Sequence, residues 1–319
     1  MNENSAIIAK ADELWNGIQK MARELGFADC GCARIVPLDG SPEARRYQEA
    51  EKNGQFGKME YLSRNVDKRM DPSLLLPGAK SVIVFLAPFS SAEGFCQTKD
   101  GLKFSEYALG EDYHKIIKDK LYRIVSLIEE NTGEKKSCRV FTDSAPVMER
   151  AWALRAGLGF IGKNNFLISP KAGIKNFLAV ILTKAELPYT DKTVPNGCGQ
   201  CTRCLDACKR KALYAPLKVD ASKCLSYKTI EEPVGEADKE RTNDLSEKWV
   251  FGCDDCMNAC PWNRFNKTGW KEFSANREFL AGLTRENWEE MTEEVFRERF
   301  KETPLFRAGL EKIKHNISR

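Results

Sequence analysis

The sequence has little histidine and no long hydrophobic run, and both shortages narrow what it can do. Its 319 residues include only two histidines, His114 and His315, so a metal site built from several histidines is nearly excluded. The longest apolar run, SVIVFLAPF (81–89), is far too short to span a bilayer. Residues 1–20 lack the basic stretch followed by an apolar one that marks a secretory signal. We therefore expect a cytoplasmic protein with no membrane segment.

The chain also lacks a strong excess of charge. Its net charge is +4, with 42% hydrophobic and 30% charged residues, a composition typical of soluble globular proteins. Such a balance neither demands nor excludes nucleic acid, because binding needs only a local basic face. The length favours about two domains and is sufficient to bury a hydrophobic core.

Cysteine, in contrast, is abundant. In a chain without an export signal, twelve cysteines indicate metal or redox chemistry in place of structural disulfides. Eight of the twelve lie between residues 190 and 263. We expect the other four to be isolated, buried side chains of the core. These four are Cys30, Cys32, Cys96 and Cys138.

Hydrophobic periodicity divides the chain into three segments. Residues 1–190 predict a mixed α/β domain, residues 191–265 hold the clustered cysteines, and residues 266–319 predict a short helical extension. Within the first segment, the pattern predicts helices over 4–25 and 111–133 and strands over 27–36, 81–89 and 176–187, with a strand followed by a turn over 138–146.

The cysteine spacing C-x2-C-x2-C-x3-C in CGQCTRCLDAC (198–208) is typical of ferredoxins that carry two iron–sulfur clusters. In that motif the fourth cysteine ligates the other cluster, which requires a second set of cysteines. The second set is present in Cys224 and in the stretch FGCDDCMNACPWN (251–263), where Pro261 follows the last cysteine as in the bacterial motif.

The ligands of two [4Fe–4S] clusters are therefore expected to cross between the two sets. We assign Cys198, Cys201, Cys204 and Cys260 to the first cluster, and Cys208, Cys224, Cys253 and Cys256 to the second. Structural zinc is the alternative, since zinc also binds C-x2-C pairs. Zinc would leave an awkward pattern of four ligands within one run of eleven residues.

Two further motifs are weaker. GLGFIG (157–162) matches the dinucleotide fingerprint, but that site needs a strand before it and a helix after it, and the sequence predicts the reverse. DYHKII (112–117) is one glycine short of the D-x-H-x-x-G motif that ligates cobalt in some cobalamin proteins. Because the stretch lies in a predicted helix, we expect His114 to pack or bond locally more readily than to ligate cobalt.

Several stretches together resemble the epoxyqueuosine reductase family, in order, from about residue 20 to residue 265. They are RMDPSLLLPGAKSV (69–82), YALGEDYHKIIKDKL (107–121), TDSAPVMERAWALRAGLGFIGKNNFLI (142–168), CGQCTRCLDAC (198–208), DASKCLSYKTIE (220–231) and FGCDDCMNACPWN (251–263). The catalytic core of this family is similar to that of cobalamin-dependent reductive dehalogenases.

The resemblance implies an α+β protein with cob(II)alamin in a nitroreductase-like domain over 1–190, followed by a bacterial-type two-cluster ferredoxin module over 191–265. It implies reduction of epoxyqueuosine to queuosine at the wobble base of tRNA, by a monomer that receives electrons from an external low-potential donor. Longer members carry a C-terminal helical-repeat domain, whereas this chain ends at Arg319. Basic residues of the tail, Arg307, Lys312 and Lys314, are therefore the candidates for tRNA phosphate contact.

The same resemblance implies the residues of the site. It places the proton donor at Asp143, and a carboxyl buried beside a corrin would have a raised pKa. The alternative is that Asp143 caps a helix beginning near Pro146. Lys163 and Asn164 could bond substrate or phosphate, or complete a turn. The implied cobalamin contacts are Arg69, Ser105, Asp143, Leu167, Leu178, Glu231 and Asp254.

Two other functions fit parts of the sequence. A ferredoxin-type electron carrier would use the cysteine segment, but it needs no α/β domain of 190 residues. A cobalamin-dependent reductase of a small organohalide would use both segments. Such reductive dehalogenases usually carry an export signal and depend on a tyrosine near the cobalt.

Overall fold

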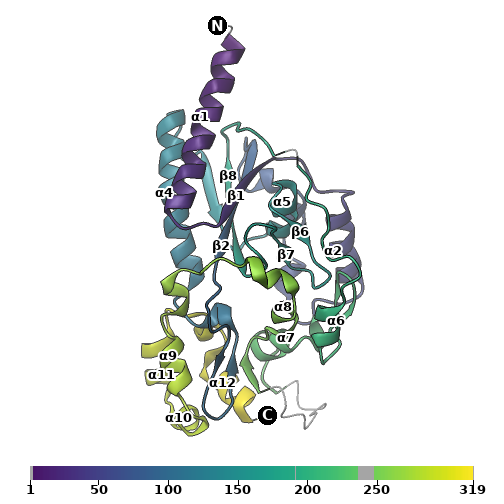
Figure 1. The fold of residues 1–319 in the computed structure, drawn as a ribbon, viewed down its shortest axis with the longest axis vertical. Coiled ribbons are helices and arrows are strands. Elements are labelled where there is room, and N and C mark those ends of the chain that lie inside the picture. Colours follow the sequence, from purple (N-terminus) through teal and green to yellow (C-terminus); the bar gives the residue numbers. More distant parts are fainter. Residues whose placement is uncertain (1–2, 191, 236–247, 319) are drawn as a thin grey trace.

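A four-stranded antiparallel sheet forms the centre of the fold (Figure 1). The computed structural model describes residues 3–190, 192–235 and 248–318. The strand order is β1-β2-β8-β5. The strands are β1 (Asp29–Arg34), β2 (Ser81–Pro88), β5 (Cys138–Phe141) and β8 (Asn176–Thr183). β2 pairs with β8 along its whole length and is buried throughout, so the apolar run predicted as a buried strand lies in the middle of the sheet.

Helices cover both faces of this sheet, as Figure 1 shows. One face packs against α1 (Glu3–Glu24) and α4 (Tyr113–Thr132), and the other against α2 (Pro42–Lys52) and α5 (Glu149–Arg155). Alternate residues of β2 therefore enter different cores: Ile83 and Phe85 face α4, whereas Val84 faces α5. The mixed α/β prediction for the first segment is confirmed.

Local sequence signals fix the ends of α4. The Asp112 side chain accepts the N–H of His114 and caps the start, and Gly133 ends the helix with a left-handed φ of 68°. His114 therefore lies in the first turn of α4. The predicted helix and its glycine stop are both confirmed.

A short hairpin and short helices connect the sheet to the later segments. The hairpin joins β6 (Phe160–Ile161) to β7 (Leu167–Ile168) and follows α5 directly. The GLGFIG motif therefore has a helix before it and a strand after it, as predicted, and β6 lies within the motif itself. One further helix, α3 (Val66–Met70), precedes β2.

The cysteine-rich segment consists of small elements. Its helices are α6 (Arg203–Ala207), α7 (Leu225–Ile230) and α8 (Asp255–Asn258), and its strands are β9 (Leu213–Ala215), β10 (Lys218–Val219) and β11 (Trp249–Phe251). α6 packs against α8. β11 pairs in parallel with β4 (Lys103–Phe104), which pairs with β3 (Cys96–Gln97), so the cysteine-rich segment joins a hairpin from the first segment.

The C-terminal segment is helical, as predicted, and shares its core with the rest of the chain. Its helices are α9 (Arg277–Gly282), α10 (Arg285–Glu290), α11 (Glu293–Phe300) and α12 (Gly309–Ser318). Trp288 and Phe300 pack with Phe104 of β4 and Phe251 of β11 in one buried cluster. Across the part of the chain that the structure describes, no helix is both long and apolar enough to cross a membrane.

The four isolated cysteines are only partly as expected. Cys32 and Cys96 are buried, whereas Cys30 and Cys138 are half-buried. Cys138 begins β5, an outer strand of the sheet, where the core no longer covers it completely.

The close packing of β1 against α5 gives a stability prediction. A Cβ at Gly31 would lie 2.2 Å from the carbonyl oxygen of Ala156 at the end of α5, and backbone cannot move aside easily. We expect Gly31→Ala to lower the free energy of unfolding by about 1–3 kcal/mol, the usual cost of overpacking. Circular dichroism during thermal unfolding measures the shift.

Gly17→Ala is the matched control for this substitution. A Cβ at Gly17 in α1 would meet its nearest neighbour, a Leu127 methyl group, at 3.6 Å, which is ordinary contact. Because alanine favours helix over glycine by about 1 kcal/mol, this variant should be as stable as the wild type or more so. Equal loss of stability in both variants would contradict the packing argument.

Candidate active site and cluster-binding cysteines

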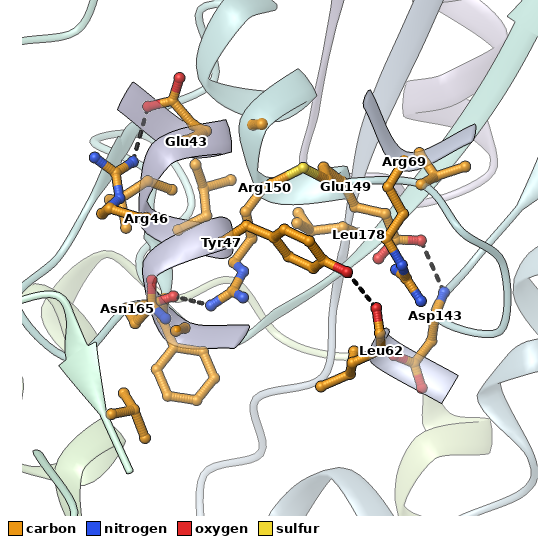
Figure 2. A pocket seen from close by; sticks show the side chains of 18 of the residues that line it. Glu43, Arg46, Tyr47, Leu62, Arg69, Asp143, Glu149, Arg150, Asn165 and Leu178 are labelled. Atoms are coloured by element: carbon orange, nitrogen blue, oxygen red, sulfur yellow. Dashed lines mark hydrogen bonds and ion pairs between the residues drawn. The ribbon is translucent and has the colours of Figure 1, made fainter. Parts of the chain in front are cut away.

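A cavity of about 570 Å³ opens on the face of the sheet that α2 and α5 cover. Its apolar wall includes Ile161, Leu167 and Leu178, contributed by the β6–β7 hairpin and by β8. Four basic residues also line it, together with the carboxyl groups of Asp143 and Glu149 (Figure 2). These four are Arg46, Arg69, Arg150 and Lys218. Apolar walls with a few polar groups are typical of sites for large organic ligands.

Four of the seven expected cofactor contacts line this cavity. Arg69 comes from α3, and one of its guanidinium nitrogens donates to the Tyr61 carbonyl at 2.8 Å. Leu167 lies on β7, Leu178 lies on β8, and Asp143 follows β5. The structure thus brings together residues that are more than a hundred positions apart in the sequence.

The other three expected contacts are not among the residues that line the cavity. Ser105 and Asp254 are buried, and the serine hydroxyl donates to the aspartate carboxylate. Burial raises the pKa of Asp254 to about 6, although this hydrogen bond opposes the rise. Glu231 ends α7 and forms an ion pair of 2.7 Å with Arg307. These residues join the cysteine-rich segment to its two neighbours.

Three groups hold Asp143. The Tyr113 hydroxyl donates to Asp143 Oδ2 at 2.6 Å, and His114 Nε2 lies 3.5 Å from the same oxygen. The backbone N–H of Asp143 donates to Glu149 Oε1 at 2.7 Å. The N-cap of α5 is Met148, so Asp143 does not cap that helix.

The expectation that the pKa of Asp143 is raised is wrong. Burial does push it upward, but the hydrogen bonds from His114 and Tyr113 outweigh burial, and the pKa is lowered. The neighbouring carboxyl, Glu149, shows the expected behaviour, because burial and the negative charge of Asp143 raise its pKa to about 8.

His114 holds a proton at neutral pH. Burial lowers its pKa, but the hydrogen bonds to Asp112 and Asp143 prevail and raise it to about 9. Nδ1 of the ring lies 2.7 Å from Asp112 Oδ1, so the histidine does bond locally, as expected. The sequence alone did not predict that Tyr113, His114 and Glu149 contact Asp143. The available signal was the position of DYH at the start of a helix that packs on the sheet.

The cysteines of the first predicted cluster surround one small cavity of about 180 Å³. Cys198, Cys201, Cys204 and Cys260 line it, and no other cysteine is among its lining residues in the described chain. Burial raises the pKa of the Cys260 thiol, and the other three thiols raise it further through their negative charge.

The cysteines of the second predicted cluster influence one another in the same way. Burial raises the pKa of Cys256, and the charges of Cys224 and Cys208 raise it further, ahead of Cys204 from the first set. Burial likewise raises the pKa of Cys253, and the negative charge of Asp255 raises it further, ahead of the charges of Cys256 and Cys224. The crossed assignment of the eight cysteines stays a prediction, and four thiols per group are the donors that [4Fe–4S] clusters take.

The described residues contain no compact site for a single metal ion. Among them, no three His, Cys, Asp or Glu side chains form a group that could hold a single metal ion. A cube-shaped cluster is held by thiolates spread around its corners, so this finding does not bear on the cluster assignment.

The GKNN turn after β6 supports both cysteine groups. Lys163 Nζ donates to the carbonyls of Gly199 and Cys201 at 2.8 and 2.9 Å. Asn164 is buried, and its amide donates to the Cys256 carbonyl at 3.3 Å. Both side chains therefore bind backbone of the cysteine loops.

The basic tail differs from the expectation. Lys312 is only 4% exposed, because it lies on the buried face of α12. The prediction that this residue contacts phosphate is therefore wrong. Lys314 Nζ donates to the carbonyls of Glu289 and Met291, both at 2.8 Å. Arg307 is half-exposed and pairs with Glu231.

Comparison with known proteins gives consistent matches. The family model described as epoxyqueuosine reductase QueG, DUF1730, matches residues 69–144, and the 4Fe-4S double cluster binding domain matches residues 197–263. The epoxyqueuosine reductase of Cyclobacterium marinum is 41% identical over 302 residues, which cover 94% of each chain. That of Pseudomonas aeruginosa is 36% identical and covers 96% of this chain and 84% of its own.

Solved structures of epoxyqueuosine reductases have a similar fold. A crystal structure of epoxyqueuosine reductase with a tRNA-Tyr epoxyqueuosine-modified stem loop superposes with a TM-score of 0.80 at 26% identity, covering 96% of this chain and 80% of that chain. The epoxyqueuosine reductase of Streptococcus thermophilus gives 0.79 at 28% identity, with 95% and 79% covered. Because curated relatives match along nearly the whole sequence, the chain belongs to the epoxyqueuosine reductase family, whose members are oxidoreductases of tRNA queuosine biosynthesis.

Proposed function

We propose that this protein reduces epoxyqueuosine to queuosine at the wobble position of tRNA. The observation that carries the proposal is the cavity in which Tyr113 and His114 hold the Asp143 carboxylate. A double-cluster domain over residues 197–263 can deliver electrons to that cavity. The reaction converts an epoxide to an alkene and water, and it consumes two electrons and two protons.

Cobalamin is the proposed cofactor of the cavity, in a domain that we describe as nitroreductase-like. The residues present fit it: the apolar wall with Leu167 and Leu178 suits a macrocycle, and Arg69 offers a donor at the polar edge. When bound, cobalamin would supply the strongly reducing cobalt, and the two clusters would supply electrons one at a time. Ser105, Glu231 and Asp254 remain proposed contacts of the same group.

Asp143 is the proposed proton donor to the departing oxygen. Because its pKa is lowered, it is ionised at neutral pH and must first receive a proton. His114 is the source within reach, since it is protonated at that pH and its Nε2 lies 3.5 Å from Asp143 Oδ2. The step from His114 to Asp143 is uphill, because the histidine has the higher pKa. The oxygen released from an epoxide is a far stronger base than either group, so the overall transfer from His114 to that oxygen is downhill.

We further propose that the protein acts as a cytoplasmic monomer with an external low-potential electron donor. Its substrate is the anticodon stem loop of a tRNA that carries epoxyqueuosine. Arg307 is the tail residue kept as the candidate for RNA contact, because its side chain is about half exposed; phosphate would have to compete with Glu231 for it. Neutralisation of phosphates by such residues would weaken binding as salt increases.

Asp143→Asn tests the donor. The amide keeps the shape and can still accept the Tyr113 hydroxyl hydrogen bond, but it cannot pass on a proton. We expect kcat to fall by about 100-fold or more, the usual contribution of general acid catalysis, with unchanged cobalamin and iron content. Mass spectrometry of nucleosides from epoxyqueuosine-containing tRNA measures turnover. Normal turnover by this variant would remove Asp143 from the role.

Cys208→Ala tests the crossed ligand assignment. The substitution should disturb the second cluster and leave the first intact, so iron should fall from about eight toward about four atoms per chain. Electron paramagnetic resonance of the reduced protein identifies the cluster that is lost. Cys96→Ala, at a buried cysteine far from both groups in sequence, should keep both signals. If Cys208→Ala perturbs the first cluster alone, the crossed assignment is wrong.

The pH profile tests His114. Its pKa lies above the ordinary value, so the protonated form is favoured in the folded protein and is lost as pH rises through about 9. We expect kcat to be highest below that pH and to fall above it. His114→Gln should lower kcat and abolish this fall, whereas His315→Gln in α12 should keep the wild-type profile. A fall that persists in His114→Gln would assign the titration to another group.

A further inference from the structure

Glu149 is a carboxyl group in the cavity for which the proposed proton path has no use. It is the first residue of α5, and it lines the same cavity as Asp143. Figure 2 shows its carboxyl group turned toward the backbone nitrogen of Asp143 and joined to it by a hydrogen bond. The donor–acceptor distance is 2.7 Å, a normal length for a strong contact.

The backbone of Asp143 needs support, because its φ of 57° lies in the left-handed region. Residues other than glycine adopt this conformation uncommonly, and although aspartate does so more often than most, a hydrogen bond to its backbone helps to hold it there. The residues around it fold tightly, with the Ser144 N–H donating to the Thr142 carbonyl at 2.6 Å. Within the described residues, it is the Glu149 carboxyl group that accepts the hydrogen bond of the Asp143 amide.

Asp143 is therefore held at both of its ends. Tyr113 and His114 hold the carboxylate from α4, and Glu149 holds the backbone from α5. The loop between β5 and α5 has one further anchor beside it, the hydroxyl of Thr142, which donates to the Leu178 carbonyl at 2.9 Å. If the backbone contact were lost, Asp143 could leave the left-handed conformation and its carboxylate would swing away from Tyr113.

The raised pKa of Glu149 indicates that it acts as a hydrogen-bond acceptor and not as the anion of an ion pair. Its pKa of about 8, raised first by burial, leaves it mainly neutral at pH 7, so its carbonyl oxygen accepts the Asp143 N–H. The adjacent Arg150 extends instead to the carbonyl of Asn165, as Figure 2 shows. A neutral group of the same shape should therefore replace Glu149.

We propose that Glu149 is a positioning residue, whose carboxyl group fixes the left-handed backbone of Asp143 and so aims the Asp143 carboxylate into the cavity. This inference rests on the proposed role of Asp143. It assigns Glu149 no contact with the substrate and no proton to transfer.

Two substitutions at Glu149 separate its hydrogen bond from its charge. Glu149→Gln keeps the acceptor oxygen and should retain kcat within about threefold, whereas Glu149→Leu removes the acceptor and should lower kcat by about 100-fold, the usual effect of misplacing a reacting group. KM for an epoxyqueuosine-containing stem loop should stay unchanged in both. An equal loss of kcat in both variants, or none in Glu149→Leu, would overturn the proposal.

Glu129→Leu is the matched control. Glu129 on α4 also accepts a backbone N–H through its carboxylate, that of Ser137 at 3.2 Å, but it does not line the cavity. Removing this contact should leave kcat unchanged, because Ser137 lies before β5 and Asp143 lies after it. A similar loss of kcat in Glu129→Leu would show that the effect is a general weakening of the fold.

A double-mutant cycle asks whether Glu149 acts through Asp143. Asp143→Asn combined with Glu149→Leu should be no less active than Asp143→Asn alone. An asparagine at position 143 cannot donate the proton, so its orientation no longer affects kcat. Losses that multiply would show an independent role for Glu149 and overturn the proposal.

Hydrogen exchange at the Asp143 amide provides a readout without catalysis. Exchange should accelerate in Glu149→Leu and stay slow in Glu149→Gln, and unchanged exchange in the leucine variant would contradict the inference. If Glu149→Leu does not fold, slow exchange in the wild type and Glu149→Gln still tests the contact, and fast exchange in both overturns it. An inactive wild type, or an active Asp143→Asn, would instead overturn the proposed function and leave the exchange result standing.

Discussion

The attachment of the cysteine-rich segment to the α/β domain is the constraint on which the rest of the structure depends. α6 and α8 have five and four residues, far fewer than a helix needs to be stable alone. Their loops keep their shape because Lys163 and Asn164 bind backbone carbonyls beside the cysteines. The same turn belongs to the β6–β7 hairpin that walls the large cavity, so the cavity and both cysteine groups share one support.

A buried polar network makes this attachment specific. Lys175, just before β8, forms an ion pair with Glu106, and the backbone N–H of Glu106 donates to Asp254 between two cysteines of the second group. All three side chains are less than 10% exposed. Removing one partner of a buried ion pair typically costs about 3–5 kcal/mol, so an arrangement that left Lys175 or Glu106 buried without its partner would be disfavoured.

The sequence predicted well whatever depends on local pattern. The buried strand β2 and the ends of α4 follow from periodicity and capping residues, and the structure agrees. The grouping of eight cysteines follows from their spacing and stays a prediction, with the four of the first group around one cavity. It did not predict the pairing of β11 with β4, because that pairing joins segments about 145 positions apart and each strand has only two or three residues. The burial of Lys312 was missed for a similar reason, since basic composition does not show which face of α12 packs on the core.

The pKa values of Asp143 and Glu149 also could not be predicted from the sequence. Burial alone suggests a raised pKa for a carboxyl in a cavity, and the sequence gives no information on its hydrogen-bond donors. Asp143 has two donors to its carboxylate and is ionised, whereas Glu149 beside it, which receives only a backbone N–H, is mainly neutral. Two adjacent carboxylates would repel each other, so ionisation of one favours protonation of the other. With His114 protonated, its ring lies between two ionised carboxylates, those of Asp112 and Asp143, whose pKa values are both lowered. A proton that passes from His114 to Asp143 leaves the net charge of this pair unchanged, so an ionised carboxylate can serve as the proposed donor.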